Sequence, residues 1–166
     1  MGPPAPPMRD CLIVDSHSPN HTRRLGQRLA KALKPGDVVL LSGPLGAGKT
    51  VFAQGLARGL GVTSGVSSKS FVLLGEYQGR LKMYHADLYR LTHPQEAADL
   101  GLEDYCSDGV LVVEWPERAL DVFPQDRLVI SFEVMDERRR RLTLKATGPR
   151  SKRLLAALCE KKWSSP

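Results

Sequence analysis

The sequence has few cysteines and no long apolar run. Its 166 residues contain only Cys11, Cys106 and Cys159, an odd number of widely separated cysteines without a metal-ligand spacing. Free or buried thiols in a reducing compartment are therefore expected, which argues against a disulfide-stapled secreted domain. No segment has the length of apolar sequence needed to cross a bilayer. Together these features predict a cytoplasmic protein that makes no membrane contact.

Targeting signals are also missing from the first residues. Residues 1–7 lack the apolar stretch of a signal peptide, and position 6 is a proline where a myristoylation signal has Ser or Thr. A chain of 166 residues is long enough to form one hydrophobic core, and a second full domain is not expected. We expect a disordered tail at 1–10, a single domain at 11–160 and a short C-terminal tail at 161–166.

Charge is distributed unevenly along the chain. The formal net charge is +6, but residues 137–166 hold ten Lys or Arg and two Glu, so their +8 leaves −2 for residues 1–136. Residues 96–126 hold nine Asp or Glu and a single cation, Arg118. Such polarity can steer a partner or a nucleic acid, or it can simply be a solvated surface.

The most informative motif is a glycine-rich segment at residues 43–50, which fits the P-loop pattern GxxxxGK[ST] at every specified position. An apolar stretch at 37–42 before it predicts a buried strand, and residues 51–58 after it predict a helix. Glycines let the backbone approach a phosphate, and the start of a helix favours an anion. Lys49 supplies a cation for the terminal phosphates and Thr50 a hydroxyl for Mg²⁺. The predicted nucleotide-binding residues here are Gly43, Leu45, Gly46, Ala47, Gly48, Lys49, Thr50 and Val51.

The remaining pattern predicts an α/β fold. An amphipathic helix is expected from Ser18-Pro19 to Pro35-Gly36, and residues 71–77 and 81–86 are predicted to form a hairpin. A buried strand at 110–113, a half-buried strand at 128–134, a returning segment at 142–146 and a closing helix follow. The expected architecture is P-loop NTPase-like: a mostly parallel central sheet with helices on both faces and an inserted antiparallel hairpin.

Two carboxylates are candidates to complete a catalytic site. Glu114 follows the apolar strand at 110–113, and the carboxyl end of such a strand faces the ligand crevice of an open α/β sheet. Of the two carboxylates, Glu114 is the better candidate for a magnesium ligand. Thr50 is the other predicted ligand. Asp87 could position an attacking water, touch the metal shell, or pair with Arg90. His85 is interpreted as a packed strand residue.

At this point four segments together resemble the TsaE (YjeE) family. They are Leu45 to Thr50, Val66 to Phe71, Tyr84 to Leu91 and Val113 to Arg118, where the family has LGAGKT, SPTF, HFDLYRL and EWPER. The likeness extends over about residues 22–141. It departs from the family at Ser68-Lys69-Ser70, which lacks the family proline, and at Pro44, where the family often has an acidic residue.

The resemblance implies a small ATPase that serves threonylcarbamoyladenosine synthesis in tRNA, next to the anticodon. Such a protein acts on the TsaB–TsaD complex, with TsaC in the same pathway, and hydrolyses ATP slowly when alone. By position, Lys49, Asp87 and Glu114 would be catalytic, and Thr50 and Glu114 would hold Mg²⁺. Thr22 would lie near the base of the ATP. Trp115 and residues 67–71 would lie near the nucleotide or the partner.

The run Arg138 to Arg141 allows several interpretations. Arg138 could stack on the adenine or pair with phosphate, and it is included among the predicted nucleotide-binding residues. The run could equally be a solvated turn. Direct tRNA contact is less expected than an indirect or weak one, because aromatic residues that stack on unpaired bases make up only 6% of the chain.

Two other functions fit the P-loop. A small-molecule kinase would need an acceptor pocket and a lid, which the arginine run could supply. A nucleotide-dependent adaptor would bind ATP without needing to split it.

Overall fold

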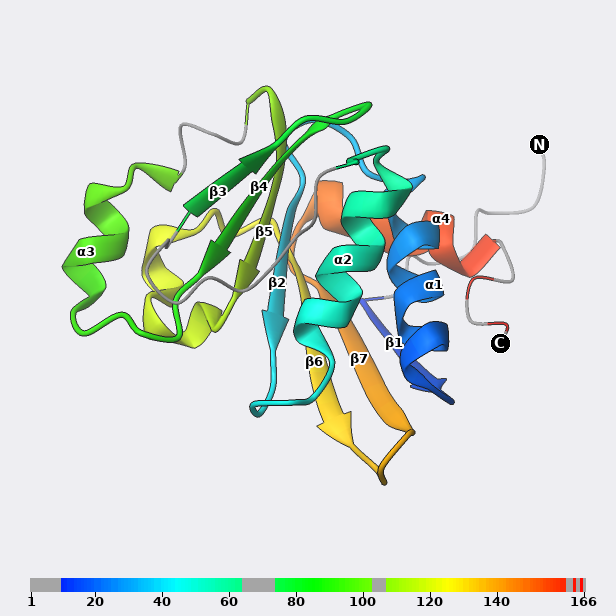
Figure 1. The fold of residues 1–166 in the computed structure, drawn as a ribbon. Coiled ribbons are helices and arrows are strands. Elements are labelled where there is room, and N and C mark those ends of the chain that lie inside the picture. The colour runs from blue at the N-terminus through cyan, green and yellow to red at the C-terminus, as the bar shows by residue number, and fades with distance from the viewer. Residues whose placement is uncertain (1–9, 64–73, 103–106, 161–162, 164, 166) are drawn as a thin grey trace, which may run out of the picture.

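A single seven-stranded sheet organises the chain (Figure 1). The computed structural model describes residues 10–63, 74–102, 107–160, 163 and 165. The strands are β1 (Cys11–Ser16), β2 (Val38–Ser42), β3 (Leu74–Tyr77), β4 (Lys82–Asp87), β5 (Gly109–Glu114), β6 (Leu128–Val134) and β7 (Arg140–Ala146). The helices are α1 (Pro19–Ala30), α2 (Lys49–Gly59), α3 (Pro94–Asp99) and α4 (Pro149–Glu160), with 3-10 turns at Pro116–Arg118 and Leu120–Val122.

The sheet is parallel in its centre and antiparallel at both sides. Its order is β1-β7-β6-β2-β5-β4-β3, with β2 parallel to both β6 and β5, and β5 parallel to β4. The β3–β4 hairpin is antiparallel, as are the β6–β7 and β1–β7 pairs. The predicted P-loop-like α/β class, with its inserted hairpin, is confirmed. The edge strand β1 is an addition to the elements that the sequence pattern predicts.

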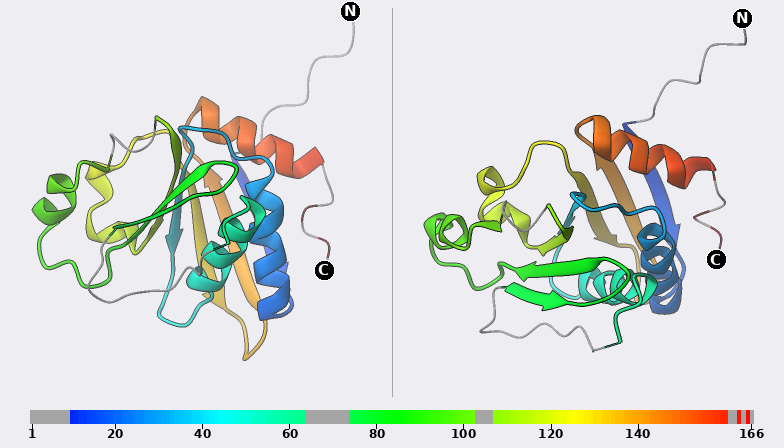
Figure 2. Two further views of the ribbon diagram at one scale, coloured as in Figure 1. Left: turned by 45° about the horizontal axis from the view of Figure 1, so that its top comes forward. Right: turned by 90° about the horizontal axis from the view of Figure 1, so that it is seen from above.

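The alternation of side chains along β2 explains why both faces of the sheet are covered. Val39 and Leu41 belong to one buried cluster with residues of α1, α2 and α4, whereas Val38 and Leu40 belong to a second. The second cluster also contains Ala97 of α3. Figure 2 shows α1 and α2 side by side and far from α3. Buried on both faces, β2 is a rigid support for the loop that follows it.

The start and end of α1 follow its sequence. Ser18 is the N-cap, its side chain accepts a hydrogen bond from the backbone N–H of His21, and Pro19 occupies the first turn. The helix ends at Ala30, before the predicted stop at Pro35-Gly36.

No described helix meets the length and hydropathy of a membrane-spanning segment. The family-like segment at 66–71 lies outside the described residues.

Candidate nucleotide-binding site

The glycine-rich loop connects the end of β2 to the start of α2. Gly46 has φ +80°, in the left-handed region that glycine adopts at little cost, although a Cβ there would meet no atom within 4 Å. Gly43 is confined by space as well, because a Cβ would lie 2.7 Å from the carbonyl oxygen of Phe132 on β6. Gly48 caps α2 without a side-chain hydrogen bond. The first amides of α2 are thus positioned to bind an anion.

Lys49 lies inside the pocket and is 4% exposed. Its Nζ donates a hydrogen bond to the carbonyl oxygen of Gly43 and lies 3.3 Å from the centroid of the Trp115 ring. Burial lowers the pKa of Lys49, opposed by the charges of Glu114, Glu117 and Asp87. The ammonium group is therefore held by a carbonyl and an aromatic face, both of which a phosphate could replace.

Trp115 forms one wall of the pocket in a conformation unusual for its residue type. It has φ +60° and is the one described non-glycine residue with positive φ. Its backbone N–H donates to Leu41 of β2, and its ring lies 4.9 Å from that of Tyr89, between centroids. Left-handed residues of this kind persist only where the surroundings fix them, and they concentrate at functional sites.

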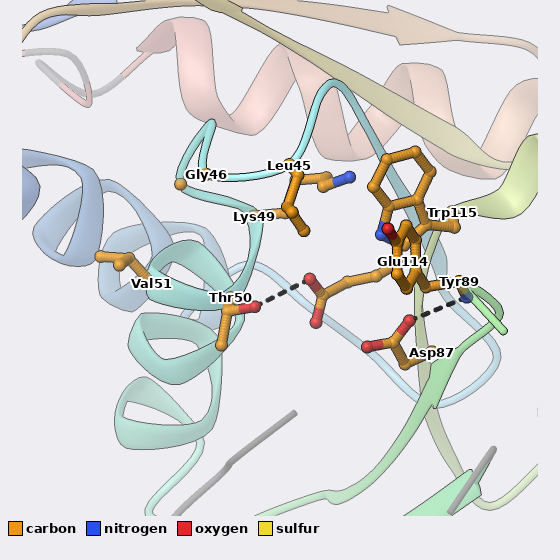
Figure 3. Close-up of a pocket in the computed structure, with 10 residues that line it drawn as sticks. Leu45, Gly46, Lys49, Thr50, Val51, Asp87, Tyr89, Glu114 and Trp115 are labelled. Carbon is orange, nitrogen blue, oxygen red and sulfur yellow. Dashed lines mark hydrogen bonds between the residues drawn. The ribbon is translucent and has the colours of Figure 1, made fainter. Parts of the chain in front are cut away.

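The two predicted carboxylates meet at the carboxyl ends of neighbouring strands. Asp87 of β4 and Glu114 of β5 are partners in the parallel register. Glu114 Oε1 accepts a hydrogen bond from Thr50 Oγ1 at 2.9 Å, and Asp87 Oδ1 accepts one from the backbone N–H of Tyr89 at 3.0 Å (Figure 3). The pocket of about 210 Å³ is lined by Leu45, Gly46, Gly48, Lys49, Thr50, Val51, Asp87, Tyr89, Glu114 and Trp115.

This oxygen set fits Mg²⁺. Thr50 and Glu114 present a hydroxyl and a carboxylate at hydrogen-bond distance, and Asp87 adds a second carboxylate to the same pocket. Mg²⁺ commonly takes one or two carboxylates and completes its shell with water and substrate phosphates. Within the described ranges no group of three His, Cys, Asp or Glu could hold a metal by itself.

His85 belongs to the site, although its sequence context predicted only a packed strand residue. Its Nε2 lies 2.7 Å from Glu114 Oε2, and both side chains are almost fully buried. Glu114 is therefore held between His85 and Thr50, one oxygen to each. The available signal was the two-residue spacing of His85 and Asp87, which places both side chains on one face of β4.

Thr22 lies close to the loop from the side of α1. It is buried, its Oγ1 is 2.7 Å from the hydroxyl oxygen of Ser16, and its methyl carbon is 3.7 Å from where a Cβ of Gly48 would be. Arg138 is exposed, and its backbone N–H donates to Asp136. The arginine that reaches the loop is Arg140, and a role for Arg138 at the nucleotide stays a prediction.

Comparisons with known proteins agree on one family. The family model for threonylcarbamoyl adenosine biosynthesis protein TsaE matches residues 16–142. The TsaE protein of Bacillus subtilis is 41% identical over 143 residues, 85% of this chain and 89% of the relative. That of Treponema pallidum is 40% identical over 130 residues, 78% and 96% respectively. The crystal structure of Bacillus subtilis YdiB superposes with a TM-score of 0.77 at 36% identity, covering 90% of this chain and 95% of that one.

Proposed function

The chain belongs to the TsaE family of threonylcarbamoyladenosine biosynthesis proteins, and we propose that it binds ATP with Mg²⁺ and hydrolyses it in that pathway. The observation that supports this most directly is the convergence of Lys49, Thr50 and Glu114 in one pocket. Asp87 lines the same pocket. A cation, a hydroxyl and two carboxylates next to a P-loop are the groups that phosphoryl transfer to water requires.

Each residue has a distinct part in the proposed reaction. Lys49 exchanges the carbonyl of Gly43 and the ring of Trp115 for the oxygens of the terminal phosphates. Thr50 and Glu114 would hold the Mg²⁺, which would supply positive charge beside those oxygens. Asp87, which lines the same pocket, orients the attacking water.

His85 contributes by orientation. Its contact with one oxygen of Glu114 leaves the other oxygen for Thr50 and the metal. Groups that orient a metal ligand in this way commonly affect metal affinity. Trp115 and Tyr89 line the same pocket, and their rings lie 4.9 Å apart between centroids.

The proposed partner is the TsaB–TsaD complex, on which hydrolysis would act to keep the modification turning over, with TsaC in the same pathway. Contact with tRNA is proposed to be indirect or weak, and the location cytoplasmic. A single domain that begins at residue 11 and a contribution of Arg138 to nucleotide binding belong to the same proposal.

The test is phosphate release from Mg-ATP by the purified protein, alone and with TsaB and TsaD. We expect slow release alone and faster release with the complex. Lys49→Ala should abolish both, because the remaining groups leave the terminal phosphate charge without its nearest cation. Release by wild type no greater than by Lys49→Ala would refute hydrolysis.

A multiple-turnover tRNA-modification assay separates hydrolysis from simple binding. Asp87→Ala and Glu114→Ala should bind ADP but fail to support repeated turnover. If both variants sustain full modification, the protein is a nucleotide-dependent adaptor and not an ATPase in this role.

A further inference from the structure

Arg140, the first residue of β7, connects two parts of the chain through one guanidinium group. Its Nε donates to the carbonyl oxygen of Ala47 at 3.2 Å and its Nη2 to that of Gly46 at 3.3 Å. Its Nη1 donates to the carbonyl oxygens of Asp136 at 2.7 Å and Arg139 at 3.0 Å. The glycine-rich loop is thereby attached to the turn of the β6–β7 hairpin.

The peptide geometry of the loop gives this contact a consequence. In a trans peptide the carbonyl and the following N–H point in opposite directions. Fixing the oxygen of Ala47 toward Arg140 therefore turns the N–H of Gly48 to the opposite side. The N–H of Ala47, which follows the fixed carbonyl of Gly46, closes the loop by donating to Pro44. The position of two consecutive peptide planes thus depends on one side chain.

We propose that Arg140 is a positioning residue of the nucleotide site, which holds the glycine-rich loop in its phosphate-binding conformation by attaching it to the β6–β7 hairpin. This inference rests on the proposed nucleotide binding. Arg140 acts on the backbone of the loop and needs no contact with the nucleotide. The planar fork of arginine supplies donors in several directions, whereas lysine offers the same charge from a single point.

The neighbouring arginines provide matched controls. Arg139 pairs with Asp136 through Nε at 2.6 Å, and Arg141 pairs with Asp15 at 2.8 Å. Both are exposed ion pairs, which contribute little to stability. An arginine-to-lysine change at any of the three positions leaves the net charge unchanged. Only the change at Arg140 removes hydrogen bonds to the glycine-rich loop.

The experiment measures binding of a fluorescent ADP analogue and steady-state ATP hydrolysis by wild type, Arg139→Lys, Arg140→Lys and Arg141→Lys. For Arg140→Lys we expect Kd and KM to rise by roughly tenfold with kcat within about twofold, because two loop hydrogen bonds are lost in ground state and transition state alike. The other two variants should match wild type. Equal Kd values for all three variants would overturn the inference.

A second measurement needs no nucleotide. The backbone amide NMR shifts of Ala47 and Gly48 should move in Arg140→Lys and stay in place in Arg139→Lys and Arg141→Lys. Unchanged shifts in folded Arg140→Lys would also overturn the inference. If wild type itself fails to bind the ADP analogue, the proposed function fails, while the amide shifts still test whether Arg140 positions the loop.

Discussion

At the scale of single residues, the contact between Lys49 and Trp115 is one that nucleotide binding should break. The ammonium nitrogen lies 3.3 Å from the ring centroid and donates to the carbonyl of Gly43. Phosphate oxygens compete directly for this cation, because a charged acceptor binds an ammonium more strongly than a neutral carbonyl or a ring. The indole of Trp115 would then lose its nearest charge.

This makes Trp115 a reporter of occupancy. The chain has two tryptophans, and the other, Trp163, is buried against α1 with its Nε1 donating to the carbonyl of Leu25. In Trp163→Phe, titration with Mg-ADP should give a saturable change in the emission of Trp115. The measurement is steady-state fluorescence with excitation of tryptophan alone.

The reciprocal variant is the control. In Trp115→Phe, which keeps Trp163, the same titration should leave the emission unchanged. A saturable signal from that variant would mean that the cation–ring contact is not what the nucleotide displaces.

The residues found from the sequence are those whose chemistry follows from local spacing. The P-loop pattern identifies Lys49 and Thr50. The apolar strand at 110–113 directly precedes Glu114 and so identifies that residue. His85 and Arg140 could not be assigned in this way. Their partners, Glu114 and the loop carbonyls at 46–47, are brought to them by strand pairing and by the return of β7. A short window of sequence shows that His85 and Asp87 share one face of a strand, but it does not show which distant residue either side chain contacts.

At the scale of elements, α1 and α2 approach closely because glycines line their contact. A Cβ built on Gly26 would lie 2.4 Å from the carbonyl oxygen of Phe52, and one on Gly55 would lie 2.1 Å from that of Arg23. On Gly59 it would lie 2.5 Å from the carbonyl oxygen of Gln27. The atoms that would clash are backbone, which cannot rotate away. This packing brings Thr22 of α1 next to the loop that precedes α2.

Gly55→Ala therefore tests the helix contact. An alanine in the middle of an exposed helix stabilises it by about 0.5–1 kcal/mol relative to glycine. Here the added methyl group must separate two helices, so the free energy of unfolding should fall by about 1–3 kcal/mol. Urea denaturation followed by circular dichroism measures the change.

Arg58→Ala is the matched control, because Arg58 is an exposed residue of the same helix. Its unfolding free energy should stay within about 0.5 kcal/mol of wild type. A rise in stability for Gly55→Ala would show that α1 and α2 can separate without cost.

Elements with strong local signals were predicted, and pairings between distant segments were not. The β3–β4 hairpin and the strands before the loop and before Glu114 follow from their apolar runs and turn residues. The strand β1 has a weak local signal, since only Val14 and Ser16 in it are buried and Ile13 is 61% exposed. Its place is decided by antiparallel pairing with β7, which lies more than a hundred residues away.

At the scale of the whole molecule, Trp163, near the C-terminal end of the sequence, packs against helix α1. Trp163 is 4% exposed and belongs to the same buried cluster as Leu25 and Leu29 of α1. Arg28 of α1 donates to the carbonyl oxygen of Trp163 at 2.8 Å. Trp163 lies beyond position 160, where the sequence predicts the domain to end. The core of the described chain therefore includes a side chain from the predicted tail.

Trp163→Ala should consequently destabilise the entire fold. Removing a buried tryptophan costs about 3–5 kcal/mol through lost burial and the cavity left behind, and it also leaves the carbonyl of Leu25 without the indole N–H. The urea midpoint should fall with little change in the slope, because the loss affects one cooperative unit.

Trp163→Phe, which keeps most of the apolar volume, should lose less than half as much free energy of unfolding as Trp163→Ala. Affinity for Mg-ADP in the folded state should be unchanged, since Trp163 is not among the residues that line the pocket beside the glycine-rich loop. An unfolding free energy for Trp163→Ala within about 0.5 kcal/mol of wild type, the range of ordinary surface substitutions, would instead mean that residues 161–166 are the dispensable tail that the sequence predicts.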